Sequence, residues 1–379
     1  NNLFGVDIME EAVEICKLRL FLKLAAQVGP DTARDNLGIE PLPDIDFNIR
    51  AGNTLVGYAT YEEVKRALGS KLAFDDALEK ISVKAADLQQ AFDAFLARQV
   101  EGDGSVPTED KQELRKRLKA LDDELNRTLA SEYGVSPPKK DAYAKWLKSH
   151  QPFHWFVEFY GIMGNAGFDV IIGNPPYVEY SKVKATYTVQ SFYKTLPCGN
   201  LYTLVLERCF ALTRNGGWVS MIVPLSLVCT NRTEEVRDMV KQHLTWISTY
   251  DMCPGSLFEG VAQRLSILIS RNIANERGLI RVGGYRRWVA EERPVLIQNT
   301  AYLQLPLAEG PGPLPKVVQC TEQSILKKII GTPLGQYVSE NTAPLLVHRI
   351  VRYFVKALTF VPLFVDAQGN RSKSEDYKE

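Results

Sequence analysis

The sequence predicts an α/β protein built on a Rossmann-like, doubly wound sheet. Three observations predict this fold: apolar runs of strand length, amphipathic helical segments between them, and polar residues directly after the strands. The chain has 379 residues, 45% of them hydrophobic, which is enough for two or three domains. We expect a first part of the core over residues 1–60, a helical hairpin over 61–150, the second part of the core over 151–275 and a C-terminal extension over 276–379.

The first expected elements are a strand, a helix and a second strand. Residues 3–7 form a short apolar run, and a strongly helical stretch follows from about residue 9 to residue 28. Residues 47–50 predict the second strand, which ends at the turn formed by residues 51–54. A βαβ unit therefore opens the core.

Residues 61–133 are rich in charge and predict an antiparallel helical hairpin. Apolar residues recur at three- and four-residue spacing in both arms, namely Ile81, Leu88, Phe92 and Phe95, then Leu114, Leu118, Leu121, Leu125 and Leu129. Glycine and proline in residues 102–107 break the helix, and Thr108 is the expected N-cap of the second arm. The hairpin interrupts the α/β pattern.

The α/β pattern resumes with the apolar run of residues 168–173, which predicts a parallel strand buried on both faces. Helices are then expected over residues 201–212 and 233–244, and strands over residues 217–224, 246–252 and 265–270. This alternation predicts a mostly parallel sheet. Beyond residue 275 shorter β-like pieces indicate an extension of mixed structure.

Composition excludes several classes of protein. The 45 Lys and Arg residues balance 45 Asp and Glu residues, so a nucleic-acid partner must be held by a local basic surface or by a part outside this sequence. No apolar run reaches the roughly 18 to 20 residues of a membrane span, so we expect a cytoplasmic protein without a membrane partner. The six cysteines form no C-x-x-C pair and the four histidines have no ligand spacing, so we expect no metal.

The segment Asn174-Pro175-Pro176-Tyr177 carries the chemistry that the sequence suggests. It follows a predicted strand directly, where ligands bind in open α/β sheets. The prolines fix the backbone and leave the Pro175 carbonyl as an acceptor, while Asn174 offers a second acceptor and Tyr177 a flat stacking face. Two acceptors above an aromatic ring suit the exocyclic amino group of a base. The plain alternative is a strand-ending turn with an exposed tyrosine.

This motif after a Phe-Asp-Val-Ile-Ile-Gly strand resembles the signature of amino-group methyltransferases that use S-adenosyl-L-methionine. It is most similar to the gamma-class adenine-N6 DNA enzymes, as in type IIG restriction-modification and related phage-exclusion systems. Further segments fall in the order of that class, at residues 3–8, 51–55, 153–156, 216–224 and 257–260. The resemblance covers residues 1–271 and implies methyl transfer to N6 of an adenine flipped out of double-stranded DNA.

The resemblance also implies which residues form the site. Asp7 and Ile8 would lie at the cofactor ribose, and Asn53 and Thr54 at the cofactor adenine. The catalytic set would be Asn174, Pro175, Pro176 and Tyr177, with Asn174 also touching the cofactor and Phe258 stacking on the target base opposite Tyr177.

Each of these residues has a structural alternative. Asp7 and Glu10 have the spacing of a D-x-x-E capping box, and Asn53 fits an ordinary turn. Phe258 fits a core aromatic residue. Two further aromatic residues, Trp155 and Phe156, are expected to pack in the core.

The glycine-rich loop that wraps the methionine end of the cofactor in this family has no counterpart in the expected order. In the family's sheet the strand before that loop lies between the Asp7 strand and the strand of residues 168–173. Its loss would leave unpaired backbone groups. We therefore expect a further N-terminal segment, or a partner chain, to supply the strand and the loop.

Other functions stay open at this stage. The motif is also similar to that of enzymes that methylate protein glutamine or an RNA base, and the missing glycine-rich loop favours a non-catalytic DNA- or protein-binding module. Pro197-Cys198 superficially resembles the nucleophile of cytosine-C5 methyltransferases, but it does not end a strand. Pro43-Asp44 with Glu63-Val64-Lys65 fits a nuclease pattern only loosely.

Overall fold

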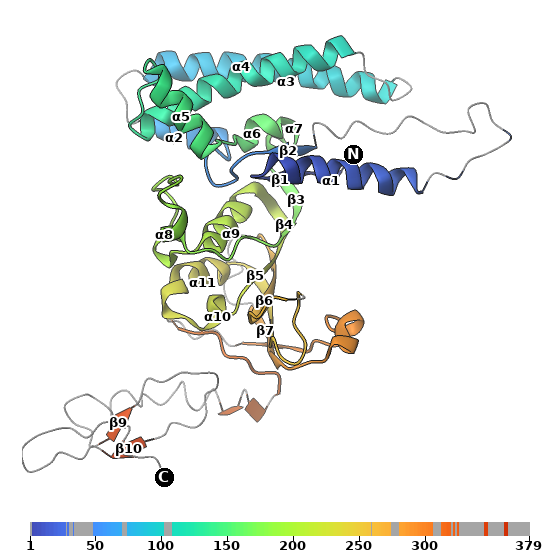
Figure 1. Cartoon of the computed structure of the whole chain (residues 1–379), viewed down its shortest axis with the longest axis vertical. Helices are drawn as coiled ribbons and strands as arrows, with labels where there is room; N and C mark the ends of the chain where they lie inside the picture. The colour runs from blue at the N-terminus through green and yellow to red at the C-terminus, as the bar shows by residue number, and fades with distance from the viewer. Residues whose placement is uncertain are drawn as a thin grey trace, which may run out of the picture. The chain divides into compact units, whose positions relative to one another are not determined.

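The computed structural model describes residues 2–27, 29, 33, 48–69, 74–101, 108–258, 260–273, 280–305, 312–319, 321–322, 324–325, 345–347 and 360–362. The chain divides into two compact units, Asn1–Val317 and Val318–Glu379. In the second unit β9 (Leu345–Val347) pairs antiparallel with β10 (Phe360–Pro362). All the predicted site residues lie in the first unit (Figure 1).

The described part of the first unit contains two sheets. In the small sheet β1 (Gly5–Asp7) runs parallel to β2 (Ile49–Ala51), and α1 (Glu10–Ala25) contacts both strands. The large sheet has six strands in the order β3-β4-β6-β5-β7-β8. From β3 to β8 these strands are Phe168–Gly173, Thr213–Pro224, Leu244–Tyr250, Leu265–Arg271, Ile280–Arg286 and Tyr302–Gln304.

The predicted α/β class is confirmed, but the large sheet is mixed and not mostly parallel. β3 runs parallel to β4, and β5 runs parallel to β7, whereas β6 is antiparallel to both of its neighbours and β8 is antiparallel to β7. Residues 251–258 and 260–264 between β5 and β6 contain no helix, so the chain reverses there instead of crossing over. β7 and β8 extend the sheet beyond residue 275.

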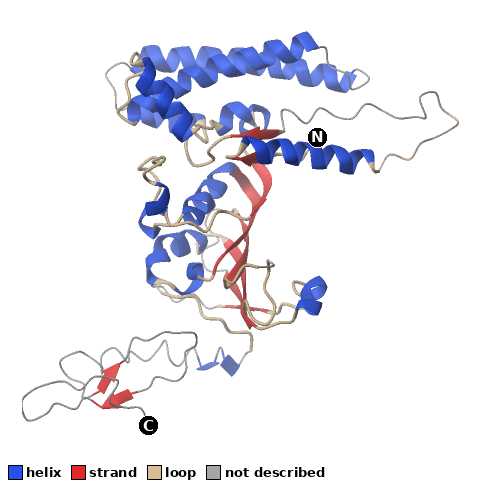
Figure 2. Cartoon of the chain, viewed as in Figure 1, coloured by secondary structure: helices blue, strands red, loops and turns tan. Residues whose placement is uncertain are grey.

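Helices cover one face of the large sheet. α9 (Leu201–Leu212), α10 (Ser226–Cys229) and α11 (Glu234–Val240) lie on the same side of the strands (Figures 1 and 2). On that side the β4 residues Val219, Met221 and Val223 are buried. On the other side Trp218, Ile222, Trp246 and Ile269 remain half-exposed.

β3 has the predicted bounds, but it is not buried on both faces. The side chains of Val170 and Ile172 are 58% and 80% exposed. Among the described residues, β3 is an edge strand of the large sheet, since β4 is its one neighbour there, and β1 and β2 form a separate sheet. An apolar run predicts that a strand can be buried, but it does not show which neighbours are present.

The helical hairpin is antiparallel, as predicted. It consists of α3 (Phe74–Glu101) and α4 (Thr108–Glu132), and ion pairs join Lys84 to Glu124 and Asp87 to Arg117. Buried on the facing sides are Ile81, Leu88, Leu114, Leu118, Leu121, Leu125 and Leu129. The break at residues 102–107 and the side chains of Phe95 and Thr108 lie outside the described part.

Shorter helices complete the first unit. They are α2 (Tyr61–Leu68), α5 (Lys140–His150), α6 (Trp155–Glu158), α7 (Tyr160–Gly164), α8 (Tyr180–Val183) and the 3-10 helices Leu196–Cys198, Asn231–Thr233 and Ala290–Val295. Among the described residues, no helix is long and apolar enough to cross a membrane. The same residues contain no cluster of His, Cys, Asp and Glu that could hold a metal ion.

Candidate active site

Asn174 and Tyr177 lie together at the carboxyl end of β3. The Tyr177 hydroxyl lies 2.9 Å from the backbone oxygen of Ile222 on β4 and 2.5 Å from Asn174 Oδ1. Burial raises the pKa of Tyr177 to about 12, so the hydroxyl keeps its proton at neutral pH. One proton serves one of these acceptors at a time, and together the contacts fix the ring beside the amide.

The two prolines leave acceptors available at this strand end. Pro175 is buried and Pro176 exposed, and neither can donate a backbone hydrogen bond. Within residues 108–258, no backbone N–H donates to the Pro175 carbonyl. Asn174 is exposed. The segment therefore presents an amide oxygen and a carbonyl oxygen on a stiff backbone.

The loop that follows Tyr177 is anchored at the start of α9. The Leu201 N–H donates to the Val178 carbonyl and the Tyr180 N–H to the Gly199 carbonyl, each at 2.9 Å. Asn200 caps α9, since its Oδ1 accepts from the Tyr202 N–H at 3.4 Å. This helix therefore holds the segment after the motif.

Asn53 lies at the end of β2 and is buried, with 3% of its surface exposed. Its Oδ1 accepts from the Leu55 N–H at 3.1 Å, as the turn alternative predicts. Its Nδ2 has no hydrogen-bond partner among the described residues. Burial raises the pKa of Tyr187, and the Asn53 amide, which lies near the Tyr187 hydroxyl, opposes that rise. A buried amide donor that makes no well-formed hydrogen bond can serve a ligand acceptor at this place.

The structure joins the Asn53 segment to the loop after the motif. Leu55 packs against Val189, Tyr193, Leu201 and Leu204. The Tyr193 hydroxyl donates to the Leu55 carbonyl at 3.0 Å. The candidate cofactor segment and the segment after the candidate catalytic motif thus share one apolar cluster.

A buried arginine, Arg208, binds both the segment after β2 and the loop after the motif. Arg208 on α9 is 2% exposed, and its Nη1 lies 3.1 and 3.0 Å from the two carboxylate oxygens of Glu63. Its Nε donates to the Tyr193 hydroxyl at 2.9 Å, and its Nη2 to the Gly57 carbonyl at 3.2 Å. No pattern in the sequence predicts a role for Arg208. The nearest local signal is the Thr60-x-x-Glu63 spacing of a helix start, where Thr60 Oγ1 accepts from the Glu63 N–H.

The buried His154 joins the hairpin to the same segment. Its Nδ1 accepts from the Tyr58 N–H at 3.2 Å, and its Nε2 lies 3.2 Å from Asn126 Oδ1 on α4. Nε2 therefore carries the proton of a neutral ring. Burial lowers the pKa of His154 to about 3, which agrees with a neutral ring. His154 therefore links Asn126 of the hairpin to Tyr58, which precedes the hairpin in the chain.

Asp7 lies at the same end of the small sheet as Asn53. It is exposed, and its Oδ1 accepts from the Met9 N–H at 2.8 Å. The predicted D-x-x-E capping box is wrong, because α1 begins at Glu10 and its N-cap residue is Met9. The helix starts too late for Asp7 to reach the third helical N–H. Ile8 is exposed as well.

The aromatic residues before β3 are core residues, as predicted. Phe156 is buried in the cluster of the hairpin. The Trp155 ring packs on Phe159 and Phe168, and its Nε1 donates to the Thr54 carbonyl at 3.2 Å. Thr54 is therefore held through its backbone.

Phe258 lies in the loop between β5 and β6 and is half-exposed. Leu265, the first residue of β6, pairs with Pro224 at the end of β4 and with Tyr250 at the end of β5. β3 runs parallel to β4, so this loop leaves the sheet at the same end of the strands as Asn174. The register of the strands, and not the sequence, reveals that both lie at this end.

Cys198 and Glu63 show no sign of the alternative chemistries. Cys198 is buried, and burial raises the pKa of its thiol to about 11, so it is not a thiolate at neutral pH. Glu63 is occupied by Arg208. Pro43 and Asp44 lie outside the described residues.

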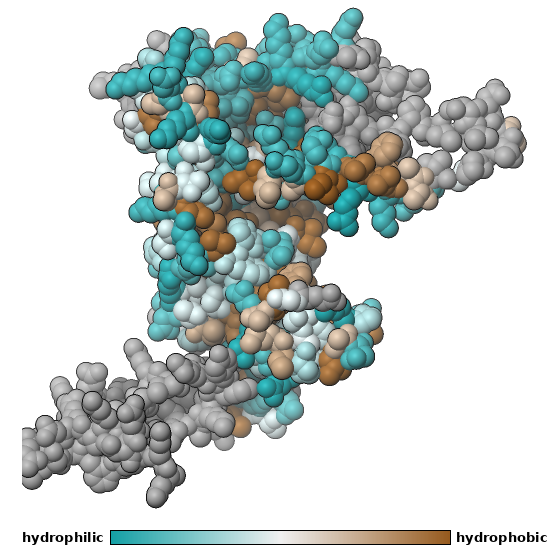
Figure 3. Space-filling model, viewed as in Figure 1, coloured by the Kyte–Doolittle hydropathy of each residue, from teal (hydrophilic) through white to brown (hydrophobic). Residues whose placement is uncertain are grey.

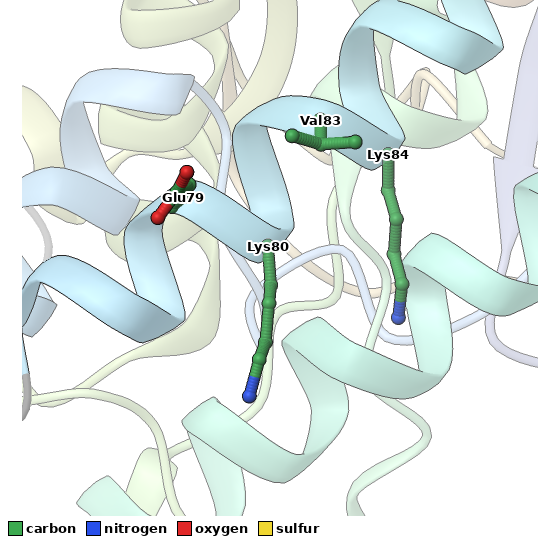
Figure 4. Close-up of a pocket in the computed structure, with 4 residues that line it drawn as sticks. All are labelled: Glu79, Lys80, Val83 and Lys84. Atoms are coloured by element: carbon green, nitrogen blue, oxygen red, sulfur yellow. The ribbon is translucent and has the colours of Figure 1, made fainter.

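A hollow on the hairpin is lined by Glu79, Lys80, Val83 and Lys84 (Figure 4). All four residues belong to α3, and Lys84 reaches Glu124 on α4 at 3.1 Å. None of the predicted site residues lines the hollow.

The fold is α/β, and the segment from Asn174 to Tyr177 directly follows β3, as the resemblance to methyltransferases predicts. The chain belongs to the Eco57I restriction-modification methylase family, whose model matches residues 1–258.

The chain is similar to a putative type II restriction enzyme and methyltransferase of Methanocaldococcus jannaschii, with 28% identity over 265 residues. The match covers 60% of this chain and 22% of the relative, so the chain spans about a fifth of that relative's length.

Two solved structures are similar over part of the chain. One is a DrdV–DNA complex, which is 14% identical; the match covers 51% of this chain and 23% of that chain, with a TM-score of 0.32. The other is a nuclease-deletion mutant of the type ISP restriction-modification enzyme LlaGI in complex with a DNA substrate mimic. It is 11% identical, and the match covers 57% of this chain and 26% of that chain, with a TM-score of 0.32.

Proposed function

We propose that this chain is the catalytic core of a DNA methyltransferase that methylates adenine N6 in a restriction-modification or phage-defence system. The observation that carries the proposal is the arrangement at the end of β3. There the Tyr177 hydroxyl contacts both the Ile222 carbonyl and Asn174 Oδ1. Membership of the Eco57I family supports DNA as the acceptor. Such an enzyme would act on DNA in the cytoplasm.

The motif would act on an adenine flipped out of the duplex. Asn174 Oδ1 and the Pro175 carbonyl would accept the two hydrogens of N6, which would hold the nitrogen lone pair in place for attack. The Tyr177 ring would stack on one face of the base and Phe258 on the other. When N6 takes the Asn174 oxygen, the Tyr177 hydroxyl still has the Ile222 carbonyl as acceptor. Catalysis would then come from positioning, with no covalent intermediate.

The small sheet would hold the cofactor. When bound, S-adenosyl-L-methionine supplies a methyl group on a sulfonium. Asp7 and Ile8 would contact its ribose, and Asn53 and Thr54 its adenine. The Nδ2 of Asn53, which makes no well-formed hydrogen bond among the described residues, supports this fit, because a buried donor at a strand end can serve a ring nitrogen.

We also propose that a further strand, carrying the glycine-rich loop, joins β1 to β3. The edge of β3 away from β4 has no partner strand in the described part of the chain. The rings of Phe4 before β1 and Phe168 at the start of β3 are 6.2 Å apart, so the two strands start near each other. A parallel strand from another segment of the protein or from a partner chain would pair with both.

Apolar surface around this edge supports the proposed strand. Val170 and Ile172 are exposed on β3. Ile15, Leu18 and Leu22 are exposed on one side of α1, where hydrophobic residues gather in Figure 3. Contiguous exposed apolar residues of this kind mark a surface that another element covers.

The domain boundaries follow from the same proposal. Residues 1–60 and 151–275 would form the methyltransferase core, residues 61–150 an inserted hairpin, and residues 276–379 an extension that leads to a target-recognition region.

Transfer of a tritiated methyl group tests the proposed reaction. In the complete protein, with unmethylated DNA as the acceptor, Asn174→Ala should abolish labelling, while Asn215→Ala, an exposed asparagine at the start of β4, should not change it. RNA and a protein with an accessible glutamine are offered in parallel. Labelling of either in place of DNA would identify the alternative acceptor class. Full labelling of DNA by Asn174→Ala would refute the assignment.

Calorimetric titration of S-adenosyl-L-methionine tests the further strand. We expect the complete protein to bind the cofactor and this chain alone to bind it at least tenfold more weakly, since positioning requires the loop. Ile172→Asp in the complete protein should also weaken binding, because a charge would be buried beside the new strand. Equal affinity of both proteins would exclude the strand. If neither protein bound the cofactor, the non-catalytic module would be the better hypothesis.

A further inference from the structure

The loop that carries Phe258 is closed at its base by a buried carboxylate. Asp251 follows β5, and its side chain is 1% exposed. Its Oδ1 lies 3.2 Å from Nε of Arg264, which precedes β6, and its Oδ2 lies 3.1 Å from Nε of Arg287. The two ends of the loop are therefore tied to each other and to the residues after β7.

The backbone of this loop packs against Trp288. The Gly255 N–H donates to the Trp288 carbonyl at 2.9 Å. A Cβ at Gly255 would lie 2.9 Å from that carbonyl oxygen and 3.0 Å from the indole ring. Trp288 is itself buried with Tyr250 and Leu296. The loop backbone thus lies directly on the indole, and glycine is required for this close approach.

Arg293 holds the backbone just before Phe258. Its Nη1 donates to the Leu257 carbonyl at 2.9 Å, and its Nη2 to the Ser256 carbonyl at 2.8 Å. The guanidinium lies over the Trp288 ring, 5.5 Å from its centroid. The Ser256 hydroxyl donates to the Phe258 carbonyl at 2.7 Å. Three successive carbonyls are therefore fixed, two of them by one planar fork.

The 3-10 helix that carries Arg293, Ala290–Val295, is itself anchored to β7. Nη1 of Arg286, the last residue of β7, donates to the Leu296 and Asn299 carbonyls at 3.3 and 3.0 Å. Arg286 also pairs with Glu292 at 3.4 Å. Arg286 of β7 therefore fixes the segment that carries the Arg293 guanidinium.

We infer that Arg293 is a positioning residue for methyl transfer, which fixes the segment Ser256–Phe258 so that the Phe258 ring stays at the edge of the sheet beside the Asn174 motif. The inference rests on the function proposed above. Arg293 acts through Phe258 and does not touch the substrate. A lysine cannot replace it, because a point charge with one set of donors does not match two carbonyls as a planar guanidinium does.

Single-turnover methyl transfer to unmethylated DNA tests this role in the complete protein. At saturating S-adenosyl-L-methionine, Arg293→Ala and Arg293→Lys should lower the rate by about 10- to 100-fold, since small displacements near reacting groups have effects of this size. Cofactor affinity should not change. Glu291→Ala, an exposed residue of the same 3-10 helix, should stay within about twofold of the wild type.

A double variant separates positioning from a general structural effect. If Arg293 acts only through Phe258, Arg293→Ala combined with Phe258→Ala should be no slower than Phe258→Ala alone. Fully additive losses would overturn the inference. Wild-type rates for Arg293→Ala, in a protein whose Phe258→Ala variant is impaired, would overturn it while the proposed function stands.

Hydrogen exchange provides a readout that needs no acceptor. Amides of residues 255–262 should exchange faster in Arg293→Ala than in the wild type, while those of α9 should not change. Absence of DNA labelling by the wild type would refute the proposed function. Unchanged exchange in this loop of Arg293→Ala would refute the positioning role of Arg293.

Discussion

The two halves of the candidate site differ in how the chain supports them. The segment after β2 is buried, and several of its backbone groups are bound by Arg208 on α9, by His154 before α6 and by Tyr193 in the loop after the motif. In the described part of the chain, the strand before Asn174 has one unpaired edge, and it exposes Val170 and Ile172. The first half is therefore held by contacts within this chain, whereas the second half leaves apolar surface uncovered.

This difference has an energetic side. Buried charges and amides are stable only when their partners are present, so the partners of Arg208 must come from the same folded unit. Exposed valine and isoleucine cost little in water and gain free energy when they are covered.

Arg208→Met should destabilise the chain by about 3 to 5 kcal/mol, because it leaves the Glu63 carboxylate buried without its partner. Urea unfolding followed by circular dichroism measures the loss. Lys65→Ala, which removes the exposed pair with Glu62 on the same helix as Glu63, should leave the unfolding midpoint unchanged. Equal effects of both variants would show that the buried network does not support the cofactor segment.

Leu121→Ala in the hairpin should cost about 2 to 5 kcal/mol, since the side chain is fully buried. Ile172→Ala on β3 should cost about 0.5 kcal/mol or less in this chain, because the side chain is already in water. The same urea experiment compares the two. A large loss for Ile172→Ala would mean that β3 is covered within this chain, contrary to the proposed further strand.

Stability should depend on pH through His154. Its pKa is about 3 in the folded chain against about 6.5 when unfolded, so its contribution is fully present above pH 6.5. Below pH 6.5 His154 is protonated in the unfolded chain but stays neutral in the folded chain. The free energy of unfolding therefore falls by about 1.4 kcal/mol for each pH unit. The expected signal is the difference in unfolding free energy between the wild type and His154→Gln, measured from pH 7 to pH 5.

Asp122 on α4 has the opposite sign and serves as the matched comparison. Burial raises its pKa to about 7, so the folded chain holds a proton that the unfolded chain releases above pH 3.8. Its effect on stability should therefore become more favourable as the pH falls from 7. A wild-type curve that differs from His154→Gln by a constant amount would contradict the buried, neutral histidine.

Tyr177→Phe should slow methyl transfer about 3- to 10-fold, since it keeps the stacking ring but removes one hydrogen bond to the Ile222 carbonyl. The rate is measured with saturating cofactor in the complete protein. Tyr143→Phe, on the remote helix α5, is the control. A faster Tyr177→Phe would instead show that the hydroxyl hinders Asn174 Oδ1.

Much of the fold follows from local patterns. The helix over Leu201–Leu212 and the strand over Phe168–Gly173 have the predicted bounds, and the hairpin buries the predicted leucines. Periodicity of apolar residues encodes which side of an element can be buried, and that information is local. The capping box at Asp7 failed because the helix starts two residues later than that spacing requires, which changes the N–H groups within reach of the Asp7 side chain.

The contacts of the candidate site were only partly predictable. The motif Asn174 to Tyr177 is contiguous, so its position after a strand could be inferred from the sequence. Arg208 and Glu63 are 145 residues apart, and no spacing indicates that they pair. The contact of Arg293 with Ser256 and Leu257 likewise depends on how β7 returns to the sheet.

Local patterns in the sequence were enough to predict most elements, the order of the segments and the place of the motif at a strand end. The antiparallel direction of β6, the edge position of β3 in the described sheet and the bond from Arg208 to the Gly57 carbonyl emerge from the folded chain. Helices and strands form from short-range periodicity, whereas pairing and burial depend on which distant residues the folded chain brings side by side.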